Sequence, residues 1–125
     1  MTFKILLIMN AVMAFLTGVA CVLVPAPLLA TYGITLIPMG FIIYQLWGAA
    51  LMGVGVLSWL VRNTTELELQ KAVAFSLFVT YGISCVHAIR GQFAGANSLG
   101  WFTVAVFAVF ALRFGYFRFI KLQTS

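Results

Sequence analysis

Charge is what this sequence lacks most. Lysine and arginine contribute seven of its 125 residues and aspartate and glutamate two, so 7% of the chain is charged and 64% is hydrophobic. A soluble domain has about 25% charged and about 45–50% apolar residues. So few charges cannot cover a water-soluble globule, because its surface would expose apolar patches larger than monomers tolerate. The composition excludes a soluble domain and predicts a protein that resides in lipid.

Acidic residues are missing from the long apolar segments. The two in the chain, Glu66 and Glu68, lie between such segments. Carboxylates inside a membrane are the usual proton and cation relay sites, and Asn10, a polar residue in the first segment, cannot titrate. The sequence therefore argues against proton-coupled transport.

Catalytic motifs are missing as well. No Ser, His and carboxylate triad, glycine-rich phosphate loop or Cys/His metal spacing is present. One histidine and two cysteines fall short of a metal-ligand set. We expect no metal site and consider an enzyme the less favoured alternative, and the sequence identifies no cofactor.

The chain does contain four long apolar segments. They cover residues 3–24, 39–61, 72–89 and 99–117. A helix of such a length measures about 27–35 Å, which matches a hydrocarbon core of about 30 Å. Membrane-spanning strands are shorter and alternate in polarity, whereas helices satisfy their own backbone groups in lipid. We predict one domain with four transmembrane helices.

Short connections and the placement of basic residues predict the topology. Connections at residues 62–71 and 90–98 imply antiparallel neighbours and an up-down-up-down four-helix bundle. An inside N terminus places six of the seven basic residues in the cytoplasm: Lys4, Arg62, Lys71, Arg113, Arg118 and Lys121. This bias follows the positive-inside rule. We predict an all-α integral membrane protein of the bacterial inner membrane with both termini cytoplasmic, and attribute its positive charge to topology and anionic lipid rather than to nucleic-acid binding.

The segment VPAPLLATYGI, residues 24–34, joins the first two predicted helices without any charge. Pro25 and Pro27 are expected to end the first helix, with Tyr32 at headgroup level and Gly33 turning the chain. We expect this segment to lie along the outer interface and cap the bundle. A cleaved secretory signal within residues 1–30 is the alternative, although its apolar region is longer than a typical signal core.

VPAPLLATYGI, followed after a short gap by QLWGAALMGVGVLSWLVRNT, resembles the DoxX-like superfamily of small four-helix membrane proteins. The resemblance implies a four-helix membrane fold and an accessory or redox-associated membrane role. Many members carry an arginine near the start of the second helix, where this chain departs from the pattern and has Tyr44 and Gln45. Both are retained as candidate ligand-binding residues.

Small residues recur four positions apart on three predicted helices. They are Ala14 and Gly18 in the first, Ala49 and Gly53 in the second, and Ser76, Thr80 and Ser84 in the third, flanked by Ala72 and Ala88. Small residues let membrane helices approach closely, so we predict that these faces assemble the bundle; a narrow polar path along the third helix is the alternative.

A bulky stripe follows the fourth predicted helix. It consists of Phe107, Phe110, Phe114 and Phe117. We expect the stripe to face lipid or another subunit, with a pigment or quinone surface as the alternative.

Polar residues near the outer helix ends form the predicted site. His87 and Arg90 lie near the end of the third helix with Gln45 at a similar depth, and a cationic pair there suits an anionic headgroup or small acid. Cys21 and Cys85 are candidates for a disulfide or redox pair, since the outer side of a bacterial membrane is oxidising. The alternative is an interfacial histidine and an arginine that reaches the phosphate layer.

Two functions follow from these observations. The first is an accessory or stabilising subunit of a larger membrane complex, whose partners are membrane lipid and other membrane subunits or further copies of itself. The second is a binding or redox-associated membrane protein that takes a quinone, lipid or anion in the outer cluster.

Overall fold

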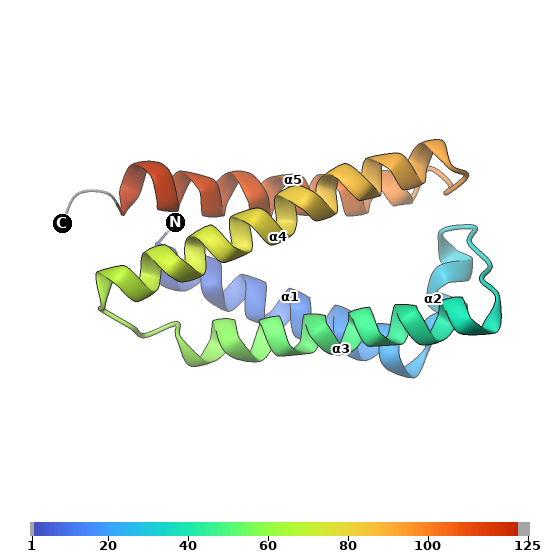
Figure 1. The fold of residues 1–125 in the computed structure, drawn as a ribbon, viewed down its shortest axis with the longest axis horizontal. Helices are drawn as coiled ribbons and strands as arrows, with labels where there is room; N and C mark the ends of the chain where they lie inside the picture. Colours follow the sequence, from blue (N-terminus) through green and yellow to red (C-terminus); the bar gives the residue numbers. More distant parts are fainter. Residues whose placement is uncertain (1, 123–125) are drawn as a thin grey trace. The chain divides into compact units, whose positions relative to one another are not determined.

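The computed structural model describes residues 2–122, which are helical nearly throughout (Figure 1). The helices are α1 (Phe3–Leu23), α2 (Pro25–Thr31), α3 (Pro38–Leu60), α4 (Leu67–Phe93) and α5 (Gly100–Tyr116), and α5 continues into a π-helical turn, η1 (Phe117–Lys121). Four stretches are long and apolar enough to cross a membrane: α1, α3, α4, and α5 together with η1. The prediction of an all-helical protein with membrane-length apolar helices is confirmed.

The chain divides into two compact units, and each is described by itself. Unit 1 extends to Asn63 and contains α1, α2 and α3; unit 2 begins at Thr64 and contains α4, α5 and η1. The two long helices within each unit run in opposite directions (Figure 1). The bundle of all four long helices, the single domain and the cytoplasmic termini stay predictions.

Proline residues begin a short helix between α1 and α3. Val24 ends α1, and Pro25 occupies the first position of α2. The first N–H groups of a helix have no intrahelical partner, so neither Pro25 nor Pro27 removes a hydrogen bond there. The segment 24–34, expected to connect the first two long helices along the outer interface, is helical over Pro25–Thr31.

Gly33 ends α2 in a Schellman motif. Its φ is 71°, a left-handed conformation that glycine adopts without steric cost. The Gly33 N–H donates to the carbonyl of Ala30 and the Ile34 N–H to that of Leu29, both at 3.0 Å. These bonds satisfy carbonyl groups that the helix end would otherwise leave open.

The α1–α3 contact has the spacing of a coiled coil. Buried residues are separated by steps of three and four: Gly48, Leu51, Gly55 and Ser58 on α3, and Leu7, Ala11, Ala14, Gly18 and Cys21 among those on α1. Such heptad steps keep one face of a helix toward its partner. Unit 1 therefore packs through a narrow seam of mainly small side chains.

Glycine lets the two backbones of this seam touch. A Cβ atom at Gly48 would lie 2.9 Å from the carbonyl oxygen of Gly18. One at Gly55 would lie 2.8 Å from the amide nitrogen of Phe15 and 2.9 Å from the carbonyl oxygen of Ala11. Only a residue without a side chain permits this approach.

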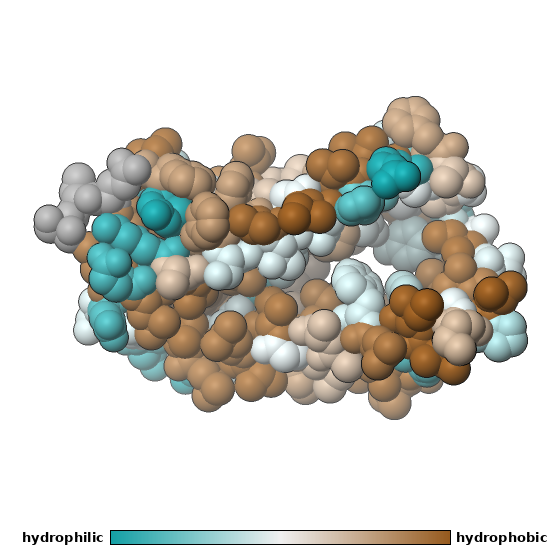
Figure 2. All heavy atoms as spheres, viewed as in Figure 1, coloured by the Kyte–Doolittle hydropathy of each residue, from teal (hydrophilic) through white to brown (hydrophobic). Residues whose placement is uncertain are grey.

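Helix α4 is longer than predicted at both ends. The sequence placed it at 72–89, whereas it extends from Leu67 to Phe93. Polar residues that resembled a loop form its first turn, where Glu68 is favoured by the positive end of the helix dipole. Its Oε1 lies 3.7 Å from Nζ of Lys71, one turn later. Figure 2 shows hydrophilic residues gathered where α4 begins.

Two amide side chains hold the turn between α4 and α5. Nε2 of Gln92 donates to the carbonyl of Asn97 at 3.0 Å, and Oδ1 of Asn97 accepts from the N–H of Leu99 at 3.1 Å. Gly95 has a φ of 128°, which side chains disfavour. Because α4 continues to Phe93, the connection that was predicted at residues 90–98 begins only after that residue.

Aromatic rings form the contact between α4 and α5. The Tyr81 ring centroid lies 5.9 Å from that of Phe107, 5.2 Å from that of Phe110 and 6.1 Å from that of Phe114. Phe110, Phe114 and Phe117 are buried. The expectation that this stripe faces lipid or another subunit is wrong, because periodicity shows that residues share a face but not what covers it.

The close approach at Gly55 generates a stability prediction. Gly55→Ala is expected to lower the free energy of unfolding by about 1–3 kcal/mol, the usual cost of overfilling a packed contact. Gly53→Ala is the matched control, because no described atom lies within 4 Å of a Cβ there and both changes alter helix propensity equally. Unfolding titrations in detergent measure both variants; equal stability would show that the backbones do not touch at Gly55.

Candidate functional site

Two polar side chains are fully buried between α1 and α3. Asn10 is 0% exposed and Ser58 is 1% exposed. Nδ2 of Asn10 donates to Oγ of Ser58 at 2.7 Å, and Ser58 donates to the carbonyl of Val54 at 2.9 Å. A polar group inside lipid must find its partner within the protein, so this pair fixes the rotation of one helix against the other.

Sequence motifs do not mark Ser58. Asn10 stands out as a polar residue in an apolar segment, whereas serine is common in membrane helices. The available signal is position, because Ser58 follows Gly55 by three residues and continues the spacing of the buried α3 face.

Cys21, Tyr44 and Gln45 lie together where α1 ends and α3 begins. Nε2 of Gln45 donates to the Val22 carbonyl at 3.0 Å. Val22 belongs to the last turn of α1, whose carbonyl groups lack intrahelical partners, so Gln45 closes that helix end. The Tyr44 side chain lies beside the buried Cys21 thiol. These predicted ligand residues therefore attach α3 to the end of α1.

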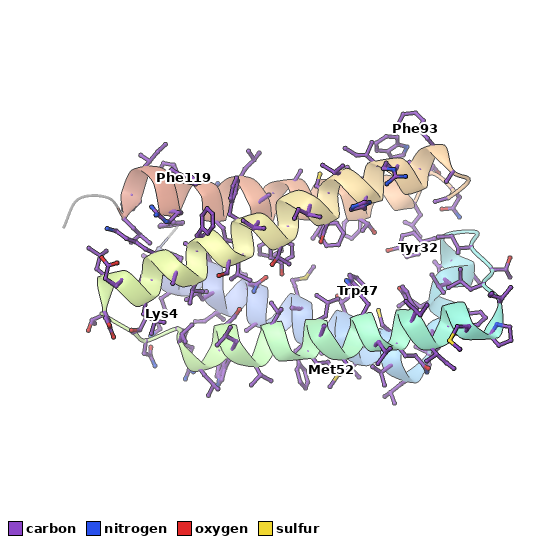
Figure 3. All side chains as sticks on the ribbon, viewed as in Figure 1. Lys4, Tyr32, Trp47, Met52, Phe93 and Phe119 are labelled. Atoms are coloured by element: carbon purple, nitrogen blue, oxygen red, sulfur yellow. The ribbon has the colours of Figure 1, made fainter. Side chains whose placement is uncertain are left out.

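Trp47 and Tyr32 also belong to unit 1 and are labelled in Figure 3. The Trp47 ring centroid lies 5.7 Å from that of Tyr44. Tyrosine and tryptophan are enriched at the membrane–water interface. The two rings belong to successive turns of α3, which runs from Pro38 to Leu60, and therefore lie within the helix rather than at its end.

His87 and Arg90 lie one turn apart on α4. Nη1 of Arg90 is 3.4 Å from Nδ1 of His87, and both side chains are exposed. A guanidinium can only donate, so His87 accepts. Close by, Sγ of Cys85 lies 3.8 Å from the Val104 carbonyl oxygen of α5.

The predicted outer cluster is distributed over both units. Unit 1 holds Cys21, Tyr44 and Gln45, and unit 2 holds Cys85, His87 and Arg90. Both cysteines are free thiols. A disulfide or ligand site shared by the two units stays a prediction. Among residues 2–122, no group of three His, Cys, Asp or Glu side chains is arranged to hold a metal ion.

The two small-residue faces predicted in unit 1 differ in their place relative to the α1–α3 contact. Ala14 and Gly18 lie in the α1–α3 contact. Ala49 and Gly53 are exposed, and α3 instead presents Gly48 and its heptad partners to α1. The reason is geometric, since steps of three and four alternate along such a seam, whereas steps of four alone drift away from it.

The small-residue face of α4 is not covered by α5. Oγ of Ser76 donates to the Ala72 carbonyl and Oγ1 of Thr80 to the Ser76 carbonyl, both at 2.8 Å. Both hydroxyl residues are exposed, and Ser84 is half-buried. The helix buries a different face, which includes Tyr81. Ser76 and Thr80 therefore do not join α4 to α5.

Comparison with known protein families, with curated proteins and with solved structures found no match. The class of protein is therefore inferred from the helices of this chain. Four helical stretches are long and apolar enough to cross a membrane, which indicates an integral membrane protein. Within residues 2–122, every buried side-chain nitrogen and oxygen has a hydrogen-bond partner.

The Asn10–Ser58 bond generates the second stability prediction. Ser58→Ala removes the acceptor and is expected to lower the free energy of unfolding by about 0.6–2 kcal/mol, the range for hydrogen bonds between membrane helices. Ser76→Ala is the control, because it removes an exposed hydroxyl that bonds only its own helix. Unfolding titrations in detergent compare the two variants.

A double-mutant cycle identifies the source of the effect. Asn10→Ala and Ser58→Ala should be less than additive, because each removes the same bond. Full additivity, or equal stability of Ser58→Ala and Ser76→Ala, would contradict the assignment.

Proposed function

We propose that this protein is a small integral membrane subunit that accompanies and stabilises a larger membrane complex. The observation that carries the proposal is the exposed α4 face of Ala72, Ser76 and Thr80, which α5 does not cover. Small residues let a second helix approach closely, and hydroxyls bond across membrane helices for roughly 0.6–2 kcal/mol each. Because Ser76 and Thr80 donate within their own helix, their oxygen atoms remain able to accept from a partner.

The uncharged centre of the long helices supports a structural role. Residues 38–60 contain no charged residue, and residues 72–86 contain neither a charged residue nor a histidine. Ionisable groups inside a membrane are the usual mark of transport and relay sites. A neutral helix surface is instead suited to contacts with lipid and with other apolar helices.

We place the protein in the plasma membrane of a bacterium, with both termini in the cytoplasm. Six of the seven basic residues then lie inside, in agreement with the positive-inside rule. The resemblance of VPAPLLATYGI and the glycine-rich segment after it to the DoxX-like superfamily also supports an accessory role.

Purification from membranes in a mild detergent tests the subunit role. The chain is expected to co-purify with a defined membrane protein, and the double variant Ser76→Leu/Thr80→Leu is expected to lose it, because bulky side chains prevent close helix approach. Val86→Leu is the control, since it enlarges another exposed residue of α4. Unchanged thermal unfolding of each purified variant confirms that the chain itself still folds.

Two results would overturn the subunit role. One is a chain that always purifies alone. The other is a partner that remains bound to the Ser76→Leu/Thr80→Leu variant as well as to the Val86→Leu control.

Reporter fusions test the proposed orientation. A cytoplasm-active reporter such as a fluorescent protein should be active at both termini, whereas a reporter active only outside should be active when inserted after Gly95, in the turn between α4 and α5. Reporter activities that place the two termini on opposite sides of the membrane would contradict the fourfold crossing.

A further inference from the structure

A groove follows the surface of unit 1 where α1 and α3 meet. Its volume is about 360 Å³, and its lining includes Ala11 and Phe15 of α1 and Gly55, Val56 and Trp59 of α3. The lining is apolar apart from the backbone and the indole N–H of Trp59. A groove of this kind, inside membrane-length helices, offers surface to hydrocarbon and little to a polar ligand.

A cation lies where the groove reaches the end of α3. The guanidinium carbon of Arg62 is 3.7 Å from the centroid of the Trp59 ring, and Nη1 donates to the Trp59 carbonyl. This cation–π contact holds the guanidinium beside the groove. The contact uses one N–H group for the carbonyl, and the planar guanidinium has further donors suited to a phosphate.

Lys4 supplies a second cation at the same end of unit 1. The Asn10–Ser58 bond shows that the start of α1 lies beside the end of α3, and Figure 3 labels Lys4 there. Lys4 precedes Ala11 by seven residues, about two helical turns, so both lie on one face of α1. Its side chain is exposed, and the described ion pair of the chain, Lys71–Glu68, does not involve it.

We propose that unit 1 binds one anionic phospholipid, with an acyl chain in the α1–α3 groove and the phosphate between Lys4 and Arg62. A phospholipid is complementary to this surface. Its acyl chain is apolar like the groove, and its anionic phosphate is opposite in charge to Arg62 and Lys4. Basic residues at a helix end attract anionic headgroups, and tryptophan is enriched at headgroup depth. This site lies on unit 1 and does not depend on the α4 face, so it is independent of the proposed subunit role.

Lipid titration observed by native mass spectrometry tests the site. The detergent-purified, delipidated chain is titrated with dioleoyl phosphatidylglycerol and, as the headgroup control, dioleoyl phosphatidylcholine. One phosphatidylglycerol should bind more tightly than phosphatidylcholine. The double variant Lys4→Ala/Arg62→Ala should lower the affinity for phosphatidylglycerol by roughly tenfold or more, whereas Arg113→Ala, which removes an exposed cation of α5, should not.

A second pair of variants tests the acyl chain in the groove. Val56 lines the groove and is 46% exposed, whereas its neighbour Leu57 is 51% exposed and is not among the lining residues. Val56→Trp should lower the affinity of the chain for both lipids, because the larger side chain fills the groove. Leu57→Trp should leave both affinities unchanged. Helical circular dichroism and thermal unfolding confirm that each variant folds.

Three results would overturn the proposal. The first is equal binding of phosphatidylglycerol to the wild-type chain and to Lys4→Ala/Arg62→Ala. The second is that the Val56→Trp variant binds each lipid as tightly as the Leu57→Trp variant does. The third is a homodimer that Val56→Trp abolishes, since a second copy of the chain would then occupy the groove.

Discussion

A backbone N–H or C=O group without a partner in hydrocarbon is costly, because no water is present to replace the missing bond. Helices meet this requirement along their length but not at their ends, where side chains and turn geometry must supply the partners. Gln45 does so for the end of α1, the Gly33 motif for α2, and Arg62 for the end of α3. Gln92 and Asn97 hold the turn that follows α4. Much of the polar chemistry of this chain is therefore committed to closing helix ends.

The two units join their long helices in different ways. In unit 1, glycines bring the backbones of α1 and α3 together, and one buried hydrogen bond from Asn10 orients them. In unit 2, Tyr81 stacks on the phenylalanine rings of α5. Lipid tails are as apolar as leucine, so hydrophobicity alone does not join membrane helices. Close contact and ring stacking supply the attraction and the specificity instead.

These two contacts also determine which side chains of each unit lie outside its own helix pair. The use of Tyr81 for packing against α5 leaves Ser76 and Thr80 exposed. The close approach at Gly55 leaves an apolar groove beside the seam, with Arg62 at its end. Both surfaces are suited to partners that share the bilayer, namely a transmembrane helix and a phospholipid.

The sequence by itself determined that the chain is helical and built for a membrane, because length and apolar composition are local properties that need no knowledge of contacts. It also identified the proline-rich start and the glycine end of α2 as places where helices change, although the short helix itself was not predicted. Only the tertiary structure decided which face of each helix is buried. Periodicity states that Ala49 and Gly53, or the phenylalanines of α5, share a face, but the partner that covers a face is set by contacts between residues far apart in the chain. For the same reason, the sequence did not show that Gln45, a predicted ligand residue, closes the end of α1. It also did not mark Ser58 as the hydrogen-bond partner of Asn10.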